Sequence, residues 1–153
     1  MANNTIKTIR LLAIARHIVK YPKTYNQQVW GRKSRGKYQY PAGCGTTACI
    51  AGHAILRYKG PLELKRAIKL DPATSAREIL GLSCAQAHDL FNPNLHWSHD
   101  WSHSLSYDLI TIHAIYASDI INDFVTRVRE NRKQGGRDLD VPMLSDGPKN
   151  ITQ

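Results

Sequence analysis

The sequence predicts an all-α fold: a single compact helical domain of about five to six helices with a long C-terminal helix. Apolar residues recur at three- and four-residue steps near the end of the chain, and cap and stop signals divide its middle into helix-length pieces. Strand signals are weak throughout, so we expect at most a minor β-ribbon in the loop at residues 31–43. A chain of 153 residues is long enough for one core and too short for two.

The first helix is expected at residues 5–20, with Asn3 or Asn4 as its cap, because Tyr21 and Pro22 follow it. A second helix is expected to start at Thr46 or Thr47, whose hydroxyl can accept bonds from first-turn amides, and to run to residue 58. Gly60 and Pro61 end it, and residues 62–70 predict a further short helix.

Two cap signals define the next helices. Asp71 followed by Pro72 is typical of a helix start, and Gly81 is typical of a helix end. Ser83 and Gln86 match a capping box, which predicts a helix that runs to about residue 91.

The long helix is expected at residues 106–129. Its apolar spacing is the clearest in the chain, and Gly135 and Gly136 must end any helix that precedes them. We therefore expect residues 1–130 to form the single domain. Residues 131–153 have few large apolar side chains, and we expect them to form a flexible C-terminal tail.

Positive charge is concentrated in the first part of the chain, although the net charge is +9 overall. There is no Asp or Glu before Glu63, whereas eleven Lys and Arg precede it. From residue 61 onward, ten basic residues face twelve acidic ones. Such an uneven distribution of charge favours an anionic partner: nucleic acid, a nucleotide, an acidic protein surface or an anionic membrane.

The chain contains three cysteines and no export signal or apolar run of transmembrane length. An odd number of cysteines without an export signal predicts reduced thiols in a cytoplasmic protein. We expect no membrane contact and no cofactor.

The densest local pattern runs from residue 43 to residue 54 and suggests a turn that leads into a helix. A helix N-terminus presents free amides and partial positive charge to anions, and the loop before this one is strongly basic. We therefore predict a phosphate-binding site here, with tyrosines that could stack on a base. Its predicted residues are Arg32, Lys33, Arg35, Lys37, Tyr38, Tyr40, Gly45, Thr46 and Thr47.

The same helix start could lower the pKa of a thiol, which makes Cys44 a candidate nucleophile; Cys49 is expected inside the helix. Its base would be His17, His53 or a histidine of residues 96–103, and Gln27 or Gln28 would be the oxyanion donor. Buried structural cysteines are the commoner alternative.

Metal binding is a weaker alternative. Cys49 with His53, and Cys84 with His88, are each spaced i and i+4, so two such pairs could form a tetrahedral zinc site if their helices cross. The connector at residues 94–104 carries three histidines and two tryptophans, which could bind metal, stack on a ligand or pack over the core.

These motifs together resemble those of a family of small uncharacterised proteins of bacteria and their phages. The core Cys-Gly-Thr-x-x-Cys-x-Ala-Gly covers residues 44–52, and the resemblance extends over about residues 10–91. Shared positions outside the core are His17, Pro22, Gln28, Trp30, Leu80, Gly81, Leu82, Ser83, Ala87, Leu90 and Phe91. The resemblance implies a fold but no activity. The basic loop at 31–43 is longer than in that family, and the position of His53 is more often aromatic.

From these observations we expect a small basic phage or bacterial protein that binds nucleic acid or a nucleotide in the host cytoplasm. A cysteine-dependent hydrolase or transferase with Cys44 as nucleophile is one alternative. The other is an inhibitor that docks on a host protein through its basic face.

Overall fold

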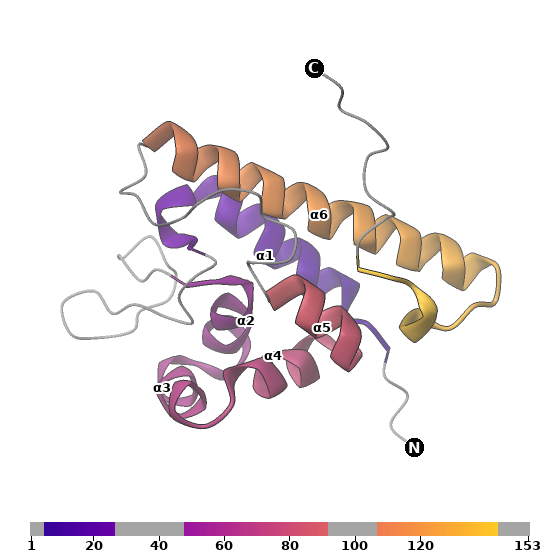
Figure 1. The fold of residues 1–153 in the computed structure, drawn as a ribbon, viewed down its shortest axis with the longest axis horizontal. Coiled ribbons are helices and arrows are strands. Elements are labelled where there is room, and N and C mark those ends of the chain that lie inside the picture. Colours follow the sequence, from indigo (N-terminus) through magenta and orange to yellow (C-terminus); the bar gives the residue numbers. More distant parts are fainter. Residues whose placement is uncertain (1–4, 27–47, 92–106, 144–153) are drawn as a thin grey trace.

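The computed structural model of the chain describes residues 5–26, 48–91 and 107–143 (Figure 1). Six α-helices make up most of these ranges, and the only strand-like pairing within them is an isolated bridge between Tyr25 and Ala48. The predicted all-α class is therefore confirmed. The loop that could hold a β-ribbon, residues 31–43, lies outside the described residues. The elements are α1 (Thr8–Lys20), η1 (Pro22–Thr24), α2 (Ile50–Lys59), α3 (Pro61–Lys69), α4 (Pro72–Leu80), α5 (Cys84–Phe91), α6 (Tyr107–Lys133) and η3 (Asp138–Asp140).

Helices α1 and α6 lie side by side and run antiparallel (Figure 1). Near the end of α6, Arg132 bonds to the carbonyl of Ile6 just before α1, whereas η1, just after α1, also contacts α6. The shorter helices α2 to α5 pack beneath this pair, with α2 in contact with α1, α3, α4 and α5. All of them contribute to one core.

The core is built from aliphatic side chains of every helix and one fully buried aromatic ring, that of Phe124. Helix α2 is central in it, because Ala51, Ala54 and Ile55 are fully buried. The small side chains of α2 allow close packing of neighbouring helices, as its composition suggests. Within the described ranges, no helix combines the length and the apolar character that a bilayer crossing requires.

Several predicted helix boundaries are confirmed at the level of hydrogen bonds. The Asp71 carboxylate accepts from the amide of Thr74 at 3.1 Å and caps α4. Gly81 ends α4 in the left-handed conformation. Ser83 and Gln86 form the predicted capping box: the Gln86 amide donates to Ser83 Oγ, and Gln86 Oε1 accepts from the Ser83 amide.

Two predicted helix starts are wrong. Helix α1 begins at Thr8, and its cap residue is Lys7, which makes no side-chain cap bond. Helix α2 begins at Ile50 and not at Thr46 or Thr47, because the Sγ of Cys49 accepts from the Gly52 amide and provides the cap. Cys49 therefore precedes the helix and does not lie inside it.

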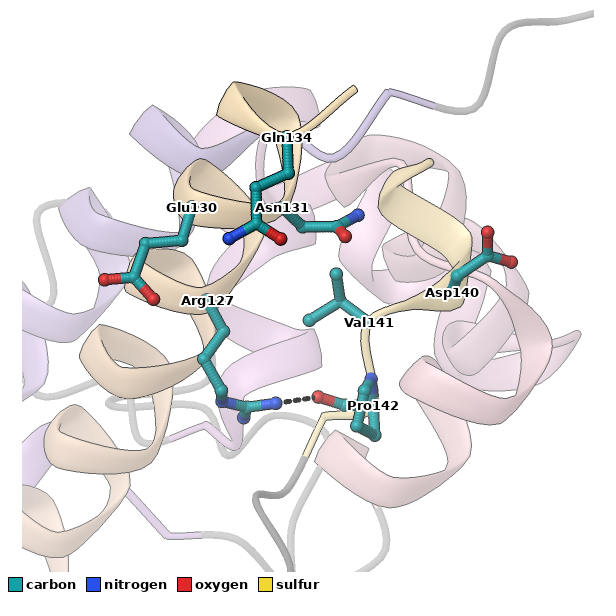
Figure 2. Close-up of a pocket in the computed structure, with 7 residues that line it drawn as sticks. All are labelled: Arg127, Glu130, Asn131, Gln134, Asp140, Val141 and Pro142. Carbon is teal, nitrogen blue, oxygen red and sulfur yellow. Dashed lines mark hydrogen bonds between the residues drawn. The ribbon is translucent and has the colours of Figure 1, made fainter. Parts of the chain in front are cut away.

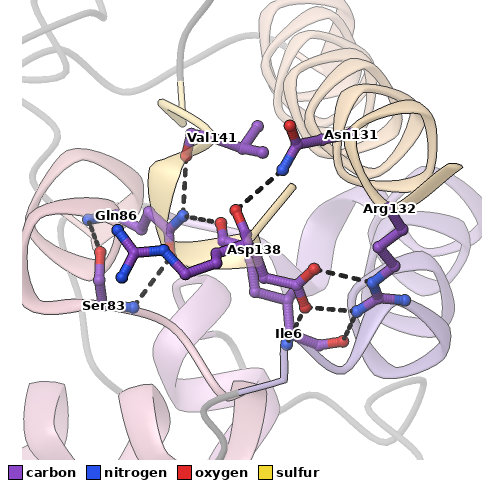
Figure 3. Close-up of polar contacts among 8 residues, drawn as sticks. Ile6, Ser83, Gln86, Asn131, Arg132, Asp138 and Val141 are labelled. Carbon is purple, nitrogen blue, oxygen red and sulfur yellow. Dashed lines mark hydrogen bonds and ion pairs between the residues drawn. The ribbon is translucent and has the colours of Figure 1, made fainter. Parts of the chain in front are cut away.

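The end of the described chain packs against the domain (Figure 3). The Asp138 carboxylate accepts from the Ile6 amide at 2.8 Å and from two nitrogens of Arg132, at 2.8 and 2.6 Å. Gln86 donates to the carbonyls of Asp138 and Val141, so the capping-box residue also holds this segment. The sequence predicts a flexible tail from residue 131, whereas α6 continues to Lys133, and Asp138, Val141 and Met143 after it are buried.

Candidate functional site

Most of the basic residues of α1, η1 and α2 are exposed. The basic residues described in the first part of the chain, which has no Asp or Glu, are all exposed except Arg10, which is half-buried. The exposed members of this group are Lys7, Arg16, Lys20, Lys23, Arg57 and Lys59. We use the name basic patch for the exposed cations Lys20, Lys23 and Arg57 together with His17, on whose pKa the charges of Arg57 and Lys20 act.

Helices α1 and α2 run antiparallel, so His17 near the end of α1 lies beside His53 in the first half of α2. His17 lies against His53, with 5.3 Å between ring centroids, and the Arg10 guanidinium lies 4.8 Å from the centroid of the Tyr58 ring. The charges of Arg57 and Lys20 both lower the pKa of His17, after the larger effect of its burial, so both cations lie within electrostatic range of this imidazole.

Aromatic rings support the cations of this surface. The Lys20 ammonium lies 5.3 Å from the centroid of the Tyr21 ring, and Arg57 lies 5.9 Å from that of Tyr58. Such contacts orient a cation through its electrostatic attraction to the face of the ring. Tyr21 is itself partly exposed, at 37%.

The bridge next to the basic patch closes the base of the segment at residues 27–47. The Asn26 amide donates to the Ala48 carbonyl at 3.1 Å, and the Ala48 amide donates to the Thr24 carbonyl at 2.9 Å. The segment that carries Arg32, Lys33, Arg35 and Lys37 therefore leaves and rejoins the described chain beside Lys23.

His53 is neutral and buried beneath the patch. Its Nε2–H donates to the Thr24 carbonyl at 2.8 Å, and its Nδ1 has no hydrogen-bond partner among the described residues. Burial lowers the pKa of His53 to about 4, and the charges of His17 and Arg57 act in the same direction. His53 thus ties α2 to the residue that anchors the 27–47 segment.

His17 is less deeply enclosed and lies between two rings. The Tyr21 ring is on one side, with 5.1 Å between centroids, and the His53 ring is on the other. Burial lowers the pKa of His17 below its ordinary value of 6.5, and the positive charges of Arg57 and then Lys20 lower it further.

Cys49 is a structural thiol. Its side chain is buried at the start of α2, and burial raises its pKa to about 11, although the amides of Gly52 and Ala51 partly oppose this effect. A thiol with so high a pKa is not a nucleophile at neutral pH. The first turn of α2, from Ile50 to Gly52, is also buried, so the amides of this helix start do not face solvent.

The residues of the predicted zinc alternative are divided between different environments. Cys49 and His53 are buried in α2, whereas Cys84 and His88 are exposed on α5. In the described ranges, no group of three or more His, Cys, Asp or Glu side chains is close enough to hold a metal ion.

The rest of the predicted site falls outside the described residues. This applies to the candidate nucleophile Cys44 and its partner Gln28, to the four loop cations with Tyr38 and Tyr40, and to Gly45, Thr46 and Thr47. It also applies to the histidines of residues 96–103. Of the predicted catalytic residues, His17 and the alternative base His53 are described, and their rings lie against each other.

A groove of about 530 Å³ lies at the other end of α1, between the end of α6 and the segment after η3 (Figure 2). Its one cation, Arg127, is already engaged: it donates to the carbonyls of Pro142 and Met143 and pairs with Asp123. Glu130 adds negative charge to the lining. The groove is therefore a poor site for an anion.

The charge asymmetry is visible in the sequence, but the members of the patch are not. Arg57 is far from Lys20 and Lys23 in sequence, and only the packing of α1 against α2 brings Arg57 and Lys20 within electrostatic range of the same imidazole. The spacing of His17 with Lys20, and of His53 with Arg57, is the signal that could have indicated them, because each pair shares one face of its helix.

Comparisons with protein-family models, with curated proteins and with solved structures find no match to the chain.

Proposed function

We propose that the protein binds a phosphate-bearing anion, nucleic acid or a nucleotide, through the basic patch and the 27–47 segment. The observation that carries this proposal is the position of the patch: its exposed cations border the point where the segment with four further cations leaves and rejoins the chain. No acidic residue occurs anywhere in the sequence from residue 1 to residue 60.

The chemistry of the patch suits phosphate. Lysine ammonium and arginine guanidinium groups form charge-assisted hydrogen bonds to phosphate oxygens, and a polyanion releases counterions when they do so. Tyr21 adds a partly exposed ring on which a base could stack. An origin in a phage or mobile element, as the motif resemblance implies, is compatible with this role.

The test is a binding titration of a short oligothymidylate that lacks terminal phosphates, followed by fluorescence anisotropy at several salt concentrations. The variant Lys20→Gln/Lys23→Gln should bind more weakly. The slope of log K against log salt should fall by about 0.7 for each phosphate that is no longer neutralised, so by about 1.4 for the double variant.

The matched control is Lys65→Gln/Lys69→Gln, which removes the same charge from exposed positions on α3. It should keep the wild-type slope. If both double variants bind alike, the patch is not the site, and net charge alone accounts for any affinity. The variant with Arg32, Lys33, Arg35 and Lys37 all changed to Gln tests the segment, and competition by ATP distinguishes a nucleotide site from a nucleic-acid surface.

A further inference from the structure

Residues 137–143, which follow α6, are held by the domain in the way that a protein holds a bound peptide. We call them the docked segment. Side chains of α5 and α6 donate hydrogen bonds to its main-chain carbonyls, as Figure 3 shows for α5. These bonds run from Gln86 to the carbonyls of Asp138 and Val141, from Asn131 to that of Arg137, and from Arg127 to those of Pro142 and Met143.

Side chains of the docked segment add specific contacts. The Asp138 carboxylate pairs with Arg132 at 2.6 Å. Val141 and Met143 are buried, at 7% and 1% exposure, whereas Leu139 between Asp138 and Val141 is 43% exposed. Main-chain bonds for affinity and separate sites for particular side chains are the features by which proteins recognise extended peptides.

The docked segment is not closely packed along its whole length. The groove of about 530 Å³ lies between this segment and the end of α6 (Figure 2). On one side of the groove are Arg127, Glu130, Asn131 and Gln134, and on the other are Asp140, Val141 and Pro142. The segment is therefore joined to α6 mainly by side-chain hydrogen bonds and the ion pair.

A tight turn of two glycines connects α6 to the docked segment. The Gly135 amide donates to the Arg132 carbonyl at 3.0 Å, and the Gly136 amide donates to the Asn131 carbonyl at 2.9 Å. Gly135 has a φ of 77°, which residues other than glycine rarely adopt, and a Cβ at this position would meet no atom within 4 Å. The turn thus folds the segment back, and a substitution at Gly135 acts on the turn alone.

We propose that the docked segment is exchangeable, so that the surface of α5 and α6 that holds it also receives the docked segment of a second copy of this chain. Two copies that exchange segments form a dimer. The charges match this occupant, because the segment carries two aspartates and one arginine, whereas the surface presents Arg127 and Arg132. The contacts are the same whichever copy supplies the segment, so the closed monomer and the dimer differ only at the turn. This inference is independent of the anion-binding function.

The concentration at which dimers form follows from the tether. A ligand on a short linker has an effective concentration of about 1 mM at its site. Wild-type protein should therefore stay monomeric at about 10 μM. Proline fixes φ at about −65° and has no amide hydrogen, so Gly135→Pro cannot form the closed turn. We expect this variant to dimerise at a concentration at least tenfold lower than wild type does.

Sedimentation velocity of the full chain over a range of concentrations tests this expectation. Excess synthetic peptide with the sequence of residues 136–143 should dissociate the Gly135→Pro dimer, because it occupies the same surface. Adding Val141→Ser to Gly135→Pro should weaken the dimer about tenfold or more. The matched control adds Leu139→Ser, which changes an exposed side chain of the same segment and should leave the dimer as it is.

A Gly135→Pro protein that is monomeric at every concentration overturns the proposal, and so does a dimer that the peptide does not dissociate. Should Gly135→Pro not fold, NMR of the labelled wild-type protein decides. Unlabelled peptide at about 5 mM should displace the docked segment. The amide signals of residues 138–143 should then move toward those of the free peptide, and unmoved signals refute the exchange.

Discussion

The contact between Asp138 and Arg132 should contribute more to stability than any other ion pair in the described residues, and Asp138→Asn tests this. Both carboxylate oxygens accept hydrogen bonds: Oδ1 from Arg132 Nε, and Oδ2 from Arg132 Nη2 and the Ile6 amide. An asparagine offers one oxygen and one NH2 group. Whichever way the amide is turned, its NH2 faces a donor, so at least one partner loses its bond.

The magnitude follows from burial. The Asp138 side chain is 8% exposed, so solvent screens its charge little, whereas the Arg132 side chain is 35% exposed and its charge is screened more. A hydrogen bond to a charged group contributes about 1.5 to 3 kcal/mol, and a buried donor left without a partner costs about 1 to 3 kcal/mol. We expect Asp138→Asn to lower the free energy of unfolding by about 2 to 3 kcal/mol, measured by urea denaturation with far-UV circular dichroism.

Asp140→Asn is the matched control. Asp140 lies in the same 3-10 turn and pairs with Arg137, but their side chains are 53% and 82% exposed, so solvent screens this pair and Asp140→Asn should change stability much less than Asp138→Asn does. Equal losses in the two variants would refute the reasoning from burial. The pair with Arg132 also lowers the pKa of Asp138, so the stabilisation is present above the ordinary value of 3.8 and is lost as pH falls through the lowered one.

Three further predictions concern the core and the thiols. The pKa of His53 is 6.5 in the unfolded chain and about 4 in the folded protein, so the free energy of unfolding should decrease by about 3 kcal/mol as pH falls across that range. Urea denaturation should show that His53→Gln loses less of this free energy over the same pH range. Gly81→Ala should lower the free energy of unfolding by about 2 kcal/mol or more, because a Cβ at this position would lie 2.3 Å from the Thr5 carbonyl oxygen. In the control Gly135→Ala, φ is similar but the space around the Cβ is open, so the same assay should show a loss of about 1 kcal/mol. Mass spectrometry after brief alkylation at about pH 8 should find exposed Cys84 modified and buried Cys49 intact; early labelling of Cys49 would contradict its raised pKa.

Local signals predicted the fold well where a helix end depends on residues close in sequence. The capping box of Ser83 and Gln86 and the cap at Asp71 involve partners three residues apart, so the sequence pattern contains the whole interaction. The start of α2 is not evident from the sequence, because the acceptor that caps it is the buried thiol of Cys49, which is not among the usual cap residues. The packing of residues 138–143 was missed for a different reason: Asp138 meets Ile6, at the opposite end of the domain's sequence.

The candidate site shows the same division between local and tertiary information. Charge asymmetry is a sum over residues, so the sequence contains it completely, and the spacing of His17 with Lys20 and of His53 with Arg57 puts each pair on one helix face. No local rule states that these two faces meet. They meet because the small side chains of α2 let it enter the core beside α1, and because the Thr24 carbonyl accepts a hydrogen bond from His53 Nε2, which ties α2 to the chain just after α1. A buried neutral histidine therefore helps to hold together two helices whose exposed faces carry positive charge.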